Sequence, residues 1–465
     1  MMPKHDLVII GAGPAGMAAA RQAADLGLSV AVLDEQQRAG GQIYRDVDKA
    51  APLRGDILGA DYTAGTRLTK GLRRDGIDHI SGAVVWAIEE GFRISYTREG
   101  RAAQIDADRI LLATGALERP MPISGWTLPG VMTAGAGQIL LKQSGVVAQD
   151  AVLVGSGPLL YLIAAQMVRA GSPPKAMVET QTRRDIIRAA RHIGGALRGW
   201  RYLAKGLKML AEIKRAGVPR YVGATEIVIE GDGKAKAVCF AYKGQSQRIA
   251  CDTVYLHHGV VPNMQAARSL GISYSWNADQ SAFVPTLDEW GGTGIEGVFI
   301  AGDGAGIGGA KLAEYAGRIA ALKMAQEAGK LSPDDRDRMA APLRRAVSKE
   351  NAVRPFLDAA YPPFDAALSP ADDTVVCRCE EVTAGDIRSY AKIGCLGPNQ
   401  TKAFGRAGMG PCQGRYCGLT VTALLAEANS QTPDETGYYR IRAPLKPVTL
   451  GELAAMDETT QNTAE

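Results

Sequence analysis

Four cysteines in the C-terminal quarter of the chain have the number and spacing of a metal site. Cys377 and Cys379 form a Cys-x-Cys pair, and Cys412 and Cys417 form a second pair with four residues between them. Four thiolates suit either a structural zinc ion or a [2Fe–2S] cluster. Paired ligands of structural zinc usually have about two to four residues between them, so the Cys-x-Cys pair favours the cluster, with zinc or no metal as the alternatives.

The other three cysteines, Cys239, Cys251 and Cys395, stand alone in the sequence. We expect them to be small core residues, because an unpaired thiol packs like a small apolar side chain. The chain has no Cys-x-x-Cys pair, which disfavours direct dithiol–disulfide chemistry.

A glycine-rich motif near the N-terminus could bind the pyrophosphate of a dinucleotide. An apolar run over residues 7–10 leads into Gly11, Gly13 and Gly16, and small residues then continue as an expected helix. In such a motif the first glycine permits the turn, the second lets the backbone approach the phosphates, and the third lets helix and strand pack closely. The helix N-terminus attracts the phosphates, and Asp34, at the end of the next expected strand, is placed to bind a ribose.

A second, less complete copy of this motif begins near residue 152. Gly155 and Gly157 are present, and Glu179 ends the next expected strand. Leu160 stands where the third glycine or alanine belongs, and we expect its side chain to push the helix away from the strand. Glu179 could bind a ribose and Arg183 a phosphate, so NAD(P), another nucleotide and an empty site all remain open.

Three further glycine-containing turns accompany the first motif. Gly40-Gly41-Gln42 follows the strand that ends at Asp34, Ala113-Thr114-Gly115 ends an expected strand over 108–112, and Gly302-Asp303 ends another over 297–301, before a helix expected from about Ala310. A related strand over 252–256 ends instead at His257-His258. We expect these to be a structural pair, with hydrogen-bond donation near a flavin or a partner as the alternative.

Parallel strands must position these turns, because each turn follows the end of a buried strand. We therefore predict an α/β fold with two Rossmann-like dinucleotide-binding domains and a small helical C-terminal module. The first domain takes residues 1–118 and 252–330, and the second is inserted at 119–251. Residues 331–370, which are polar and contain several prolines, are predicted to be a linker, and 371–465 to be the cysteine module and tail.

Bulk properties exclude several classes of protein. With 46% hydrophobic and 22% charged residues and a net charge of +4, nothing indicates disorder or nucleic-acid binding. No apolar run is long enough to span a bilayer. A strand is expected from residue 6, which leaves no room for a signal peptide and favours a cytoplasmic location.

One segment carries a strong excess of Lys and Arg over Asp and Glu. In residues 183–220 these cations alternate with apolar residues at helical spacing. The simplest interpretation is a solvated basic face. The alternative is a docking surface for an acidic partner protein or for membrane lipid, since complementary charge steers association.

From about residue 5 to 330 the sequence resembles the two-dinucleotide flavoproteins. In that family the late Gly-Asp pair holds the ribityl chain and pyrophosphate of FAD, which would make Asp303 a flavin ligand. The resemblance implies an FAD site made of Gly11, Gly13, Pro14, Ala15, Gly16, Asp34, Glu35, Gly41, Gln42, Val84, Ala113, Thr114, Gly115, Gly302, Asp303 and Ala310.

The cysteine segment resembles the bacterioferritin-associated ferredoxin module. In that module a Cys-x-Cys pair precedes two helices, and a second cysteine pair completes a [2Fe–2S] cluster. The resemblance implies Cys377, Cys379, Cys412 and Cys417 as ligands. The module usually ends in Cys-x-x-Cys, so the loop from Cys412 to Cys417 is wider here.

Segments 40–45, 128–136 and 409–417 resemble the larger subunit of opine oxidases and D-hydroxyproline dehydrogenases. Hydrogen cyanide synthase and the alpha subunit of heterotetrameric sarcosine oxidase are similar but more distant. In these enzymes a separate flavoprotein (beta) subunit oxidises the C–N bond and the alpha-type subunit relays electrons. The resemblance implies such a partner, with a small third subunit as an option, and no general acid or base on this chain. A stand-alone NAD(P)H-dependent reductase and a non-catalytic scaffold are the alternatives.

Overall fold

The structure is a computed structural model in which residues 4–461 are described. Five short strands form the first parallel sheet, in the order β21-β8-β2-β3-β4. Runs rich in Val, Ile and Leu suit parallel strands that are buried on both faces, and every residue of β2 is buried. The strands are β2 (Leu7–Ile10), β3 (Val30–Asp34), β4 (Ile77–Ser81), β8 (Ile110–Leu112) and β21 (Val298–Ile300).

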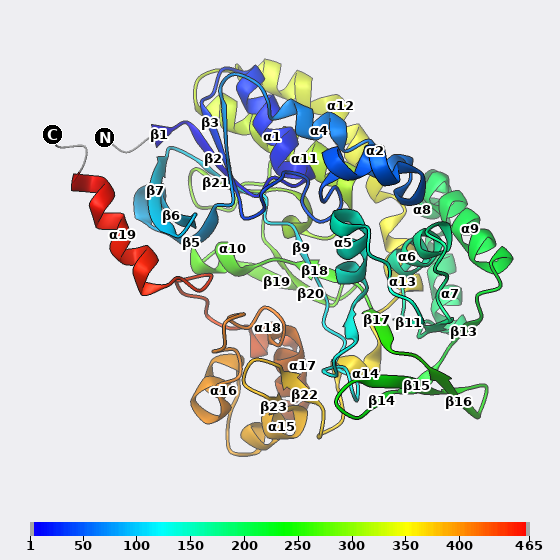
Figure 1. Cartoon of the computed structure of the whole chain (residues 1–465). Coiled ribbons are helices and arrows are strands. Elements are labelled where there is room, and N and C mark those ends of the chain that lie inside the picture. Colours follow the sequence, from blue (N-terminus) through cyan, green and yellow to red (C-terminus); the bar gives the residue numbers. More distant parts are fainter. Residues whose placement is uncertain (1–3, 462–465) are drawn as a thin grey trace.

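Two helices pack closely together beside this sheet: α1 (Pro14–Asp25) and α11 (Ala310–Glu327) (Figure 1). A Cβ atom added at Gly317 of α11 would lie 2.1 Å from the carbonyl oxygen of Ala15, so the glycine is needed for the close approach. Three further helices lie between β3 and β4: α2 (Val47–Leu58), α3 (Ala60–Thr63) and α4 (Thr66–Gly71).

The second parallel sheet has the order β10-β17-β11-β12-β13. Its strands are β10 (Val131–Thr133), β11 (Ala151–Gly155), β12 (Ala176–Glu179), β13 (Arg220–Val222) and β17 (Thr253–His257). The domain boundary predicted at residue 252 falls just before β17, but this strand pairs with β10 and β11. The chain therefore returns to the first domain only after β17, where β18 (Val260–Pro262) pairs with β9 (Ala116–Glu118).

Helices of the second domain are α5 (Ala134–Ser144), α6 (Pro158–Arg169), α7 (Arg183–Ala189), α8 (Ile193–Arg198) and α9 (Trp200–Arg215). Smaller antiparallel sheets complete both domains. They comprise β5 (Val84–Ile88), β6 (Arg93–Arg98) and β7 (Arg101–Ala107), with β1 (Lys4–His5) parallel at the edge; β14 (Thr225–Gly231), β15 (Ala235–Tyr242) and β16 (Gln245–Ala250); and β19 (Tyr274–Asn277) with β20 (Ala282–Pro285).

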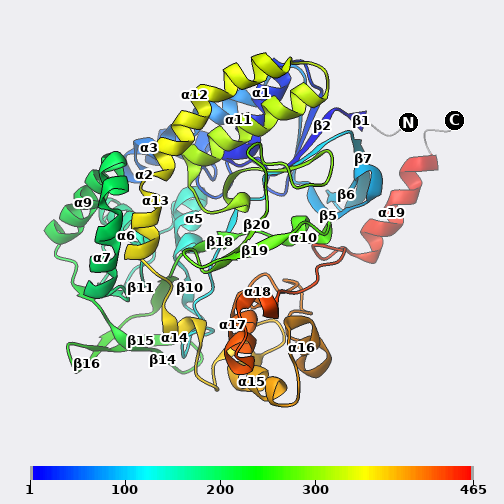
Figure 2. The ribbon, with the colours of Figure 1, turned by 180° about the vertical axis from the view of Figure 1, so that it is seen from behind.

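The segment predicted to be a linker is mostly helical and packs on both domains. It contains α12 (Pro333–Asn351), α13 (Arg354–Ala360) and α14 (Asp365–Leu368). Arg336 and Arg344 of α12 lie 4.4 and 4.2 Å from the ring centroid of Trp290. Figure 2 shows α12 beside α11, and α13 running from there along the second domain.

The cysteine module lies below the first domain in the view of Figure 1. Its elements are β22 (Val375–Cys377), β23 (Val382–Thr383), α15 (Ala384–Lys392), α16 (Pro398–Gly405), α17 (Gly418–Asn429) and α18 (Pro433–Thr436). The chain then returns to the first domain, where α19 (Leu450–Gln461) lies beside β7. A short helix of the first domain, α10 (Gln265–Ser269), precedes β19.

Candidate functional site

The first glycine loop has the tight geometry that its sequence requires. Gly11 has φ of +109°, and a Cβ atom there would lie 2.5 Å from the carbonyl oxygen of Ala113. A Cβ atom at Gly16 would lie 1.9 Å from the carbonyl oxygen of Gly11, so helix α1 can approach β2 only with glycine at this position. Pro14 is the first residue of α1, where its missing N–H costs no hydrogen bond. The free N–H groups of α1 therefore face the loop as an anion-binding end.

The two acids at the end of β3, Asp34 and Glu35, have different roles. Asp34 is buried, and its carboxylate accepts hydrogen bonds from the backbone N–H groups of Ala12 at 2.5 Å and Gln36 at 2.7 Å. Burial raises the pKa of this carboxyl group. Asp34 thus braces the glycine loop, whereas the carboxylate of Glu35 is about half exposed and pairs with Lys446 at 2.7 Å.

The other predicted flavin motifs converge on this loop. The Cα atom of Gly41 would lie 3.9 Å from a Cβ atom added at Gly13. A Cβ atom at Gly302 would lie 2.9 Å from Cβ of Ala15, and one at Gly304 would lie 3.5 Å from the carbonyl oxygen of Gly115. Four segments far apart in the sequence thus meet around the N-terminus of α1.

Asp303 positions the helix that follows it. Its Oδ1 accepts hydrogen bonds from the N–H groups of Gly308 at 3.0 Å and Gly309 at 2.9 Å, directly before α11 begins at Ala310. Val84 begins β5, and the N–H of the preceding Ala83 donates to the carbonyl oxygen of Asp34. All predicted flavin residues therefore lie on the turns that end β2, β3, β8 and β21 or directly beside them.

A buried lysine that the sequence did not single out supports this region. The Nζ atom of Lys142, in α5, donates hydrogen bonds to the carbonyl oxygen of Gln42 at 3.0 Å and to Oε1 of Gln138 at 2.8 Å. Burial, reinforced by the nearby charge of Arg45, lowers the pKa of Lys142 to about 7. Lys142 thereby ties the Gly41–Gln42 turn to the second domain.

The second glycine loop is closed tightly on its own sheet. Gly155 has φ of +125°, and a Cβ atom there would lie 1.7 Å from the carbonyl oxygen of His257. Leu160 is fully buried in the core between α6 and the sheet. The leucine at the third position of the motif is therefore accommodated as a core residue.

Residues predicted to bind a second nucleotide make other contacts. Glu179 is buried, and its carboxylate accepts hydrogen bonds from Arg220 at 2.6 and 2.9 Å, from the Tyr161 hydroxyl at 2.7 Å and from Gln181 at 2.5 Å. Arg183 begins α7 and is exposed. The acid at the end of β12 is therefore held by this domain's own side chains.

The segment that follows α13 packs against the second glycine loop and against Tyr161. The Ser156 hydroxyl, in the middle of the glycine loop, donates to the carbonyl oxygen of Pro362 at 3.2 Å. The ring of Tyr361 packs edge-on against Tyr161 at 6.0 Å between centroids. Residues 361–362 therefore lie beside both the glycine loop, which would bind a pyrophosphate, and Glu179, which would bind a ribose.

The two histidines at the end of β17, His257 and His258, are buried, as expected for a structural pair. His258 lies with Nε2 2.7 Å from the carbonyl oxygen of Pro120, and its Nδ1 accepts the N–H of Phe364 at 3.1 Å. Burial lowers the pKa of His258 to about 3. Nδ1 of His257 lies 2.7 Å from Oε1 of Glu118, whose Oε2 accepts the N–H of Gly135 at 2.8 Å.

The four clustered cysteines meet in the module as two facing pairs. The thiol of Cys417 donates a hydrogen bond to the sulfur of Cys377, and this bond is the main reason that the pKa of Cys377 falls to about 6. Cys379 is likewise hydrogen-bonded to Cys412. Cys377 and Cys417 are buried, and Cys379 is exposed. The two sequence pairs, which flank the segment that contains α15 and α16, therefore lie in one site.

Backbone N–H groups point at these sulfurs. The N–H groups of Gly408, Glu380 and Cys379 donate to the sulfur of Cys377, which lowers its pKa further. The hydroxyl of Tyr439 lies 3.9 Å from the sulfur of Cys417. Within residues 4–461, no three His, Cys, Asp or Glu side chains converge closely enough to hold one metal ion. Four thiolates arranged as two pairs suit a group that binds two thiolates at each of two positions.

The three lone cysteines lie apart from this site. Cys251 and Cys395 are buried, and Cys239 is partly buried on β15. The sulfur of Cys395 lies 3.5 Å from the carbonyl oxygen of Gly397. All seven thiols are free.

Helix α10 connects the flavin motifs to the cysteine loop. Just before it, the N–H of Asn263 donates to the carbonyl oxygen of Gly115 at 2.9 Å. Two residues later, Nε2 of Gln265 donates to the carbonyl oxygen of Gln413 at 3.2 Å. Sequence reasoning missed Gln265, because an isolated glutamine carries no pattern that distinguishes it from a surface residue.

Arg268 of α10 is a second link to the module. Its guanidinium carbon lies 4.4, 4.9 and 4.8 Å from the ring centroids of Tyr274, Phe283 and Tyr438. Tyr438 belongs to the module, and the other two rings belong to β19 and β20. The cation therefore joins aromatic rings from both parts of the chain.

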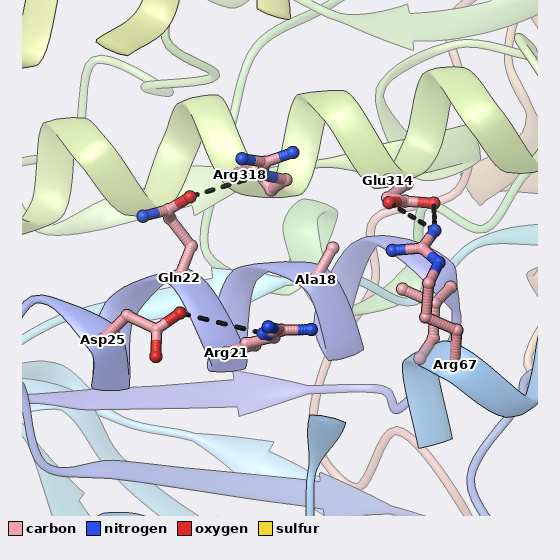
Figure 3. A pocket seen from close by; sticks show the side chains of 8 residues that line it. Ala18, Arg21, Gln22, Asp25, Arg67, Glu314 and Arg318 are labelled. Carbon is pink, nitrogen blue, oxygen red and sulfur yellow. Dashed lines mark hydrogen bonds and ion pairs between the residues drawn. The ribbon is translucent and has the colours of Figure 1, made fainter. Parts of the chain in front are cut away.

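A pocket of about 260 Å³ lies away from the glycine loops, between α1, α4 and α11 (Figure 3). Its charged side chains are already paired. Arg67 donates to Glu314 at 2.8 Å, Arg21 lies 3.7 Å from Asp25, and Arg318 donates to Gln22 at 3.2 Å. The charged side chains that line this pocket therefore bind one another.

Comparison with known families identifies the two parts of the chain. A family model described as pyridine nucleotide-disulphide oxidoreductase matches residues 5–329, and one described as the sarcosine oxidase A3 domain matches residues 372–457. The opine oxidase A subunit of Rhizobium meliloti is 42% identical over 98% of this chain and 88% of its own length. The chain belongs to the family of opine oxidase A subunits. It is a member of a flavin-dependent oxidoreductase family.

More distant relatives agree with this membership. The HcnB subunit of the hydrogen cyanide synthase of Pseudomonas aeruginosa is 33% identical over 95% of this chain and 96% of its own length. The crystal structure of L-proline dehydrogenase from P. horikoshii superposes with a TM-score of 0.72 at 18% identity, covering 97% of this chain and 79% of that chain. At this identity the likeness shows the fold alone. The α/β fold class and the resemblance to opine oxidase large subunits are confirmed.

The opine oxidase and hydrogen cyanide synthase relatives are both named as subunits, and so is the alpha subunit of the R. meliloti sarcosine oxidase at 25% identity. The family is thus one whose members work with partner chains. In the described part of this chain, none of the helices combines the length and the apolar composition needed to cross a bilayer.

Proposed function

We propose that this chain is the electron-transferring subunit of a heteromeric dehydrogenase that oxidises a secondary amine or imino acid, such as an opine or D-hydroxyproline. A partner flavoprotein subunit, with or without a small third subunit, oxidises the C–N bond. This chain carries the electrons onward and contributes no general acid or base. The observation that carries the proposal is that the flavin motifs and the four-thiol site both contact the start of helix α10, through Asn263 and Gln265.

In this proposal FAD binds across the turns that end β2, β3, β8 and β21. Gly13 and the N-terminus of α1 bind its pyrophosphate through the N–H groups of the first helical turn. Gly11, whose own N–H donates to the carbonyl oxygen of Leu33 at 2.8 Å, allows the tight turn that leads to them. Glu35 binds the adenosine ribose, since Asp34 is already occupied by backbone N–H groups. Asp303 holds the N-terminus of α11 toward the flavin.

A [2Fe–2S] cluster is the group that best suits the cysteine site. Cys377, Cys379, Cys412 and Cys417 would supply its four thiolates, and the N–H groups donated to Cys377 would stabilise negative charge on the sulfur. When both groups are bound to the chain, FAD would exchange electrons in pairs or singly, whereas the cluster would exchange them one at a time. Clustered cysteines that hold a metal group instead of forming disulfides are typical of a reducing compartment, so we propose a cytoplasmic location.

The stand-alone NAD(P)H reductase is the weaker candidate. It needs a pyridine nucleotide at the Gly155 loop, but Glu179 is held by Arg220 and Tyr161, and Ser156 adjoins Pro362. We propose that the second domain instead anchors residues 352–368, which lead to the cysteine module. A non-catalytic scaffold is disfavoured because the four flavin motifs converge.

The test is to purify the chain alone and co-expressed with its candidate flavoprotein partner. We expect flavin absorption and about two iron and two acid-labile sulfide per chain. The Cys412→Ser variant should lose iron and keep flavin, whereas the Cys239→Ser control should keep both. An opine or D-hydroxyproline should bleach the flavin only when the partner is present. Rapid bleaching of the lone chain by NADH would contradict the proposal.

A further inference from the structure

The outer face of helices α7, α8 and α9 exposes large apolar side chains. Ile187 is 72% exposed, Leu197 62%, Trp200 59% and Leu207 67%. Trp200 and Leu207 are seven residues apart in α9, which places them on the same side of the helix. The opposite side of α9 is the packed one, because Met209 and Ile213 are buried against α6. These side chains are therefore not part of the core.

Each of three exposed apolar residues is followed directly by a cation. The pairs are Leu197–Arg198, Trp200–Arg201 and Leu207–Lys208. The two acids of the segment are already neutralised, since Asp185 pairs with Arg188 and Glu212 with Arg169. Among the described residues, the following cations have no carboxylate within salt-bridge distance: Arg183, Arg184, Arg191, Arg198, Arg201, Lys208, Lys214 and Arg215.

This pattern differs from the usual protein–protein interface. The core of such an interface excludes charged side chains and gathers the apolar ones together. Here cations stand between the apolar side chains on successive turns of helix. A layer of anionic lipid headgroups accepts both kinds at once, because the apolar side chains enter the acyl boundary while Lys and Arg meet the phosphates. Tryptophan also prefers this boundary.

We propose that the outer face of α7–α9 is a docking surface for an anionic lipid bilayer. The face lies at the end of the second domain, away from the cysteine module (Figures 1 and 2). Docking there would hold the chain at a membrane while the cysteine module remains accessible. The inference rests on this face alone and does not depend on the proposed substrate or on either cofactor.

The test is vesicle co-sedimentation of the full chain, alone and in complex with its partner. The probes are vesicles of equal parts phosphatidylglycerol and phosphatidylcholine, and vesicles of phosphatidylcholine only. We expect binding to the anionic vesicles, weakened by salt. Arg198→Gln, Arg201→Gln and Lys208→Gln should each reduce affinity about fivefold, the effect of one cation near an anionic surface. The Leu197→Ser/Trp200→Ser/Leu207→Ser variant should abolish binding.

The matched control replaces exposed cations elsewhere, in the variant Arg101→Gln/Lys234→Gln/Lys330→Gln, which has the same loss of charge as the three α8–α9 substitutions combined. Its vesicle binding should equal that of the unmodified chain. The proposal is overturned if anionic vesicles do not bind, or if the control weakens binding as much as the α8–α9 variants. It is equally overturned if those variants release the partner protein from the complex, because the face would then be a protein interface.

Discussion

The side-chain amide of Gln265 donates a hydrogen bond to the backbone carbonyl of Gln413 at 3.2 Å. Gln413 follows Cys412 in the cysteine loop, and Gln265 begins the helix that follows the Asn263–Gly115 contact. The two candidate cofactor sites are thus joined through residues 263–265, where α10 begins. Gln265 is buried, so its contact is shielded from competing water.

We predict that Gln265→Ala loosens the cysteine loop without harming the flavin site. The carbonyl of Gln413 would lose its buried donor, which costs about 1–3 kcal/mol. We expect faster loss of iron to a chelator, with flavin content unchanged. Gln245→Ala, on the exposed edge strand β16, is the control and should release iron at the rate of the unmodified chain. Equal rates for both variants would contradict the proposed role of Gln265.

Arg268 should matter for how the module is held on the first domain. Replacing it with methionine keeps the bulk of the side chain but removes the cation from between Tyr274, Phe283 and Tyr438. A partly desolvated cation–π contact is worth about 1–2 kcal/mol. We expect faster hydrogen exchange in residues 433–442 and little change in β2 and β3. Lysine at this position should restore part of the protection.

The turns around α1 were predictable because their residue types are forced by backbone geometry. No side chain fits at Gly11 or Gly16, so glycine spacing alone reports the loop. The Cys-x-Cys pair was equally visible, since thiols so close together in sequence rarely occur by chance in a core. The Rossmann-like fold follows from these turns and from the buried strands before them.

Other features depend on contacts between distant segments and leave no local pattern. Glu179 has the spacing of a ribose-binding acid, yet Arg220 and Tyr161 hold it. Lys142 looks like an ordinary helix residue and becomes buried only because α5 packs on the Gly41–Gln42 turn. The return of the chain after β17 could not be placed, because β17 resembles a strand of either sheet. These features require the three-dimensional arrangement.

Glu179 should be a stability residue. Glu179→Gln leaves Arg220 without its carboxylate, and breaking a buried ion pair from one side costs about 3 kcal/mol. We expect a lower midpoint of urea denaturation and no change in the response of the flavin to NADH. Glu226→Gln, at an exposed position of the same domain, should leave the midpoint unchanged. A variant that is fully stable but has altered NADH affinity would show that Glu179 serves a nucleotide instead.

Lys142 should make stability depend on pH in the alkaline range. Its pKa falls from 10.5 to about 7 on folding, mainly through burial. Between these values the unfolded chain holds a proton that the folded chain has released, so the free energy of unfolding rises with pH. Lys142→Met removes this contribution. The stability difference between the unmodified chain and the variant should therefore grow in favour of the unmodified chain from about pH 7 to about pH 9, measured by urea denaturation. For the control Lys234→Met, at an exposed site, the stability difference from the unmodified chain should not vary with pH. If the stability difference for Lys142→Met is also independent of pH, Lys142 stays protonated in the folded chain.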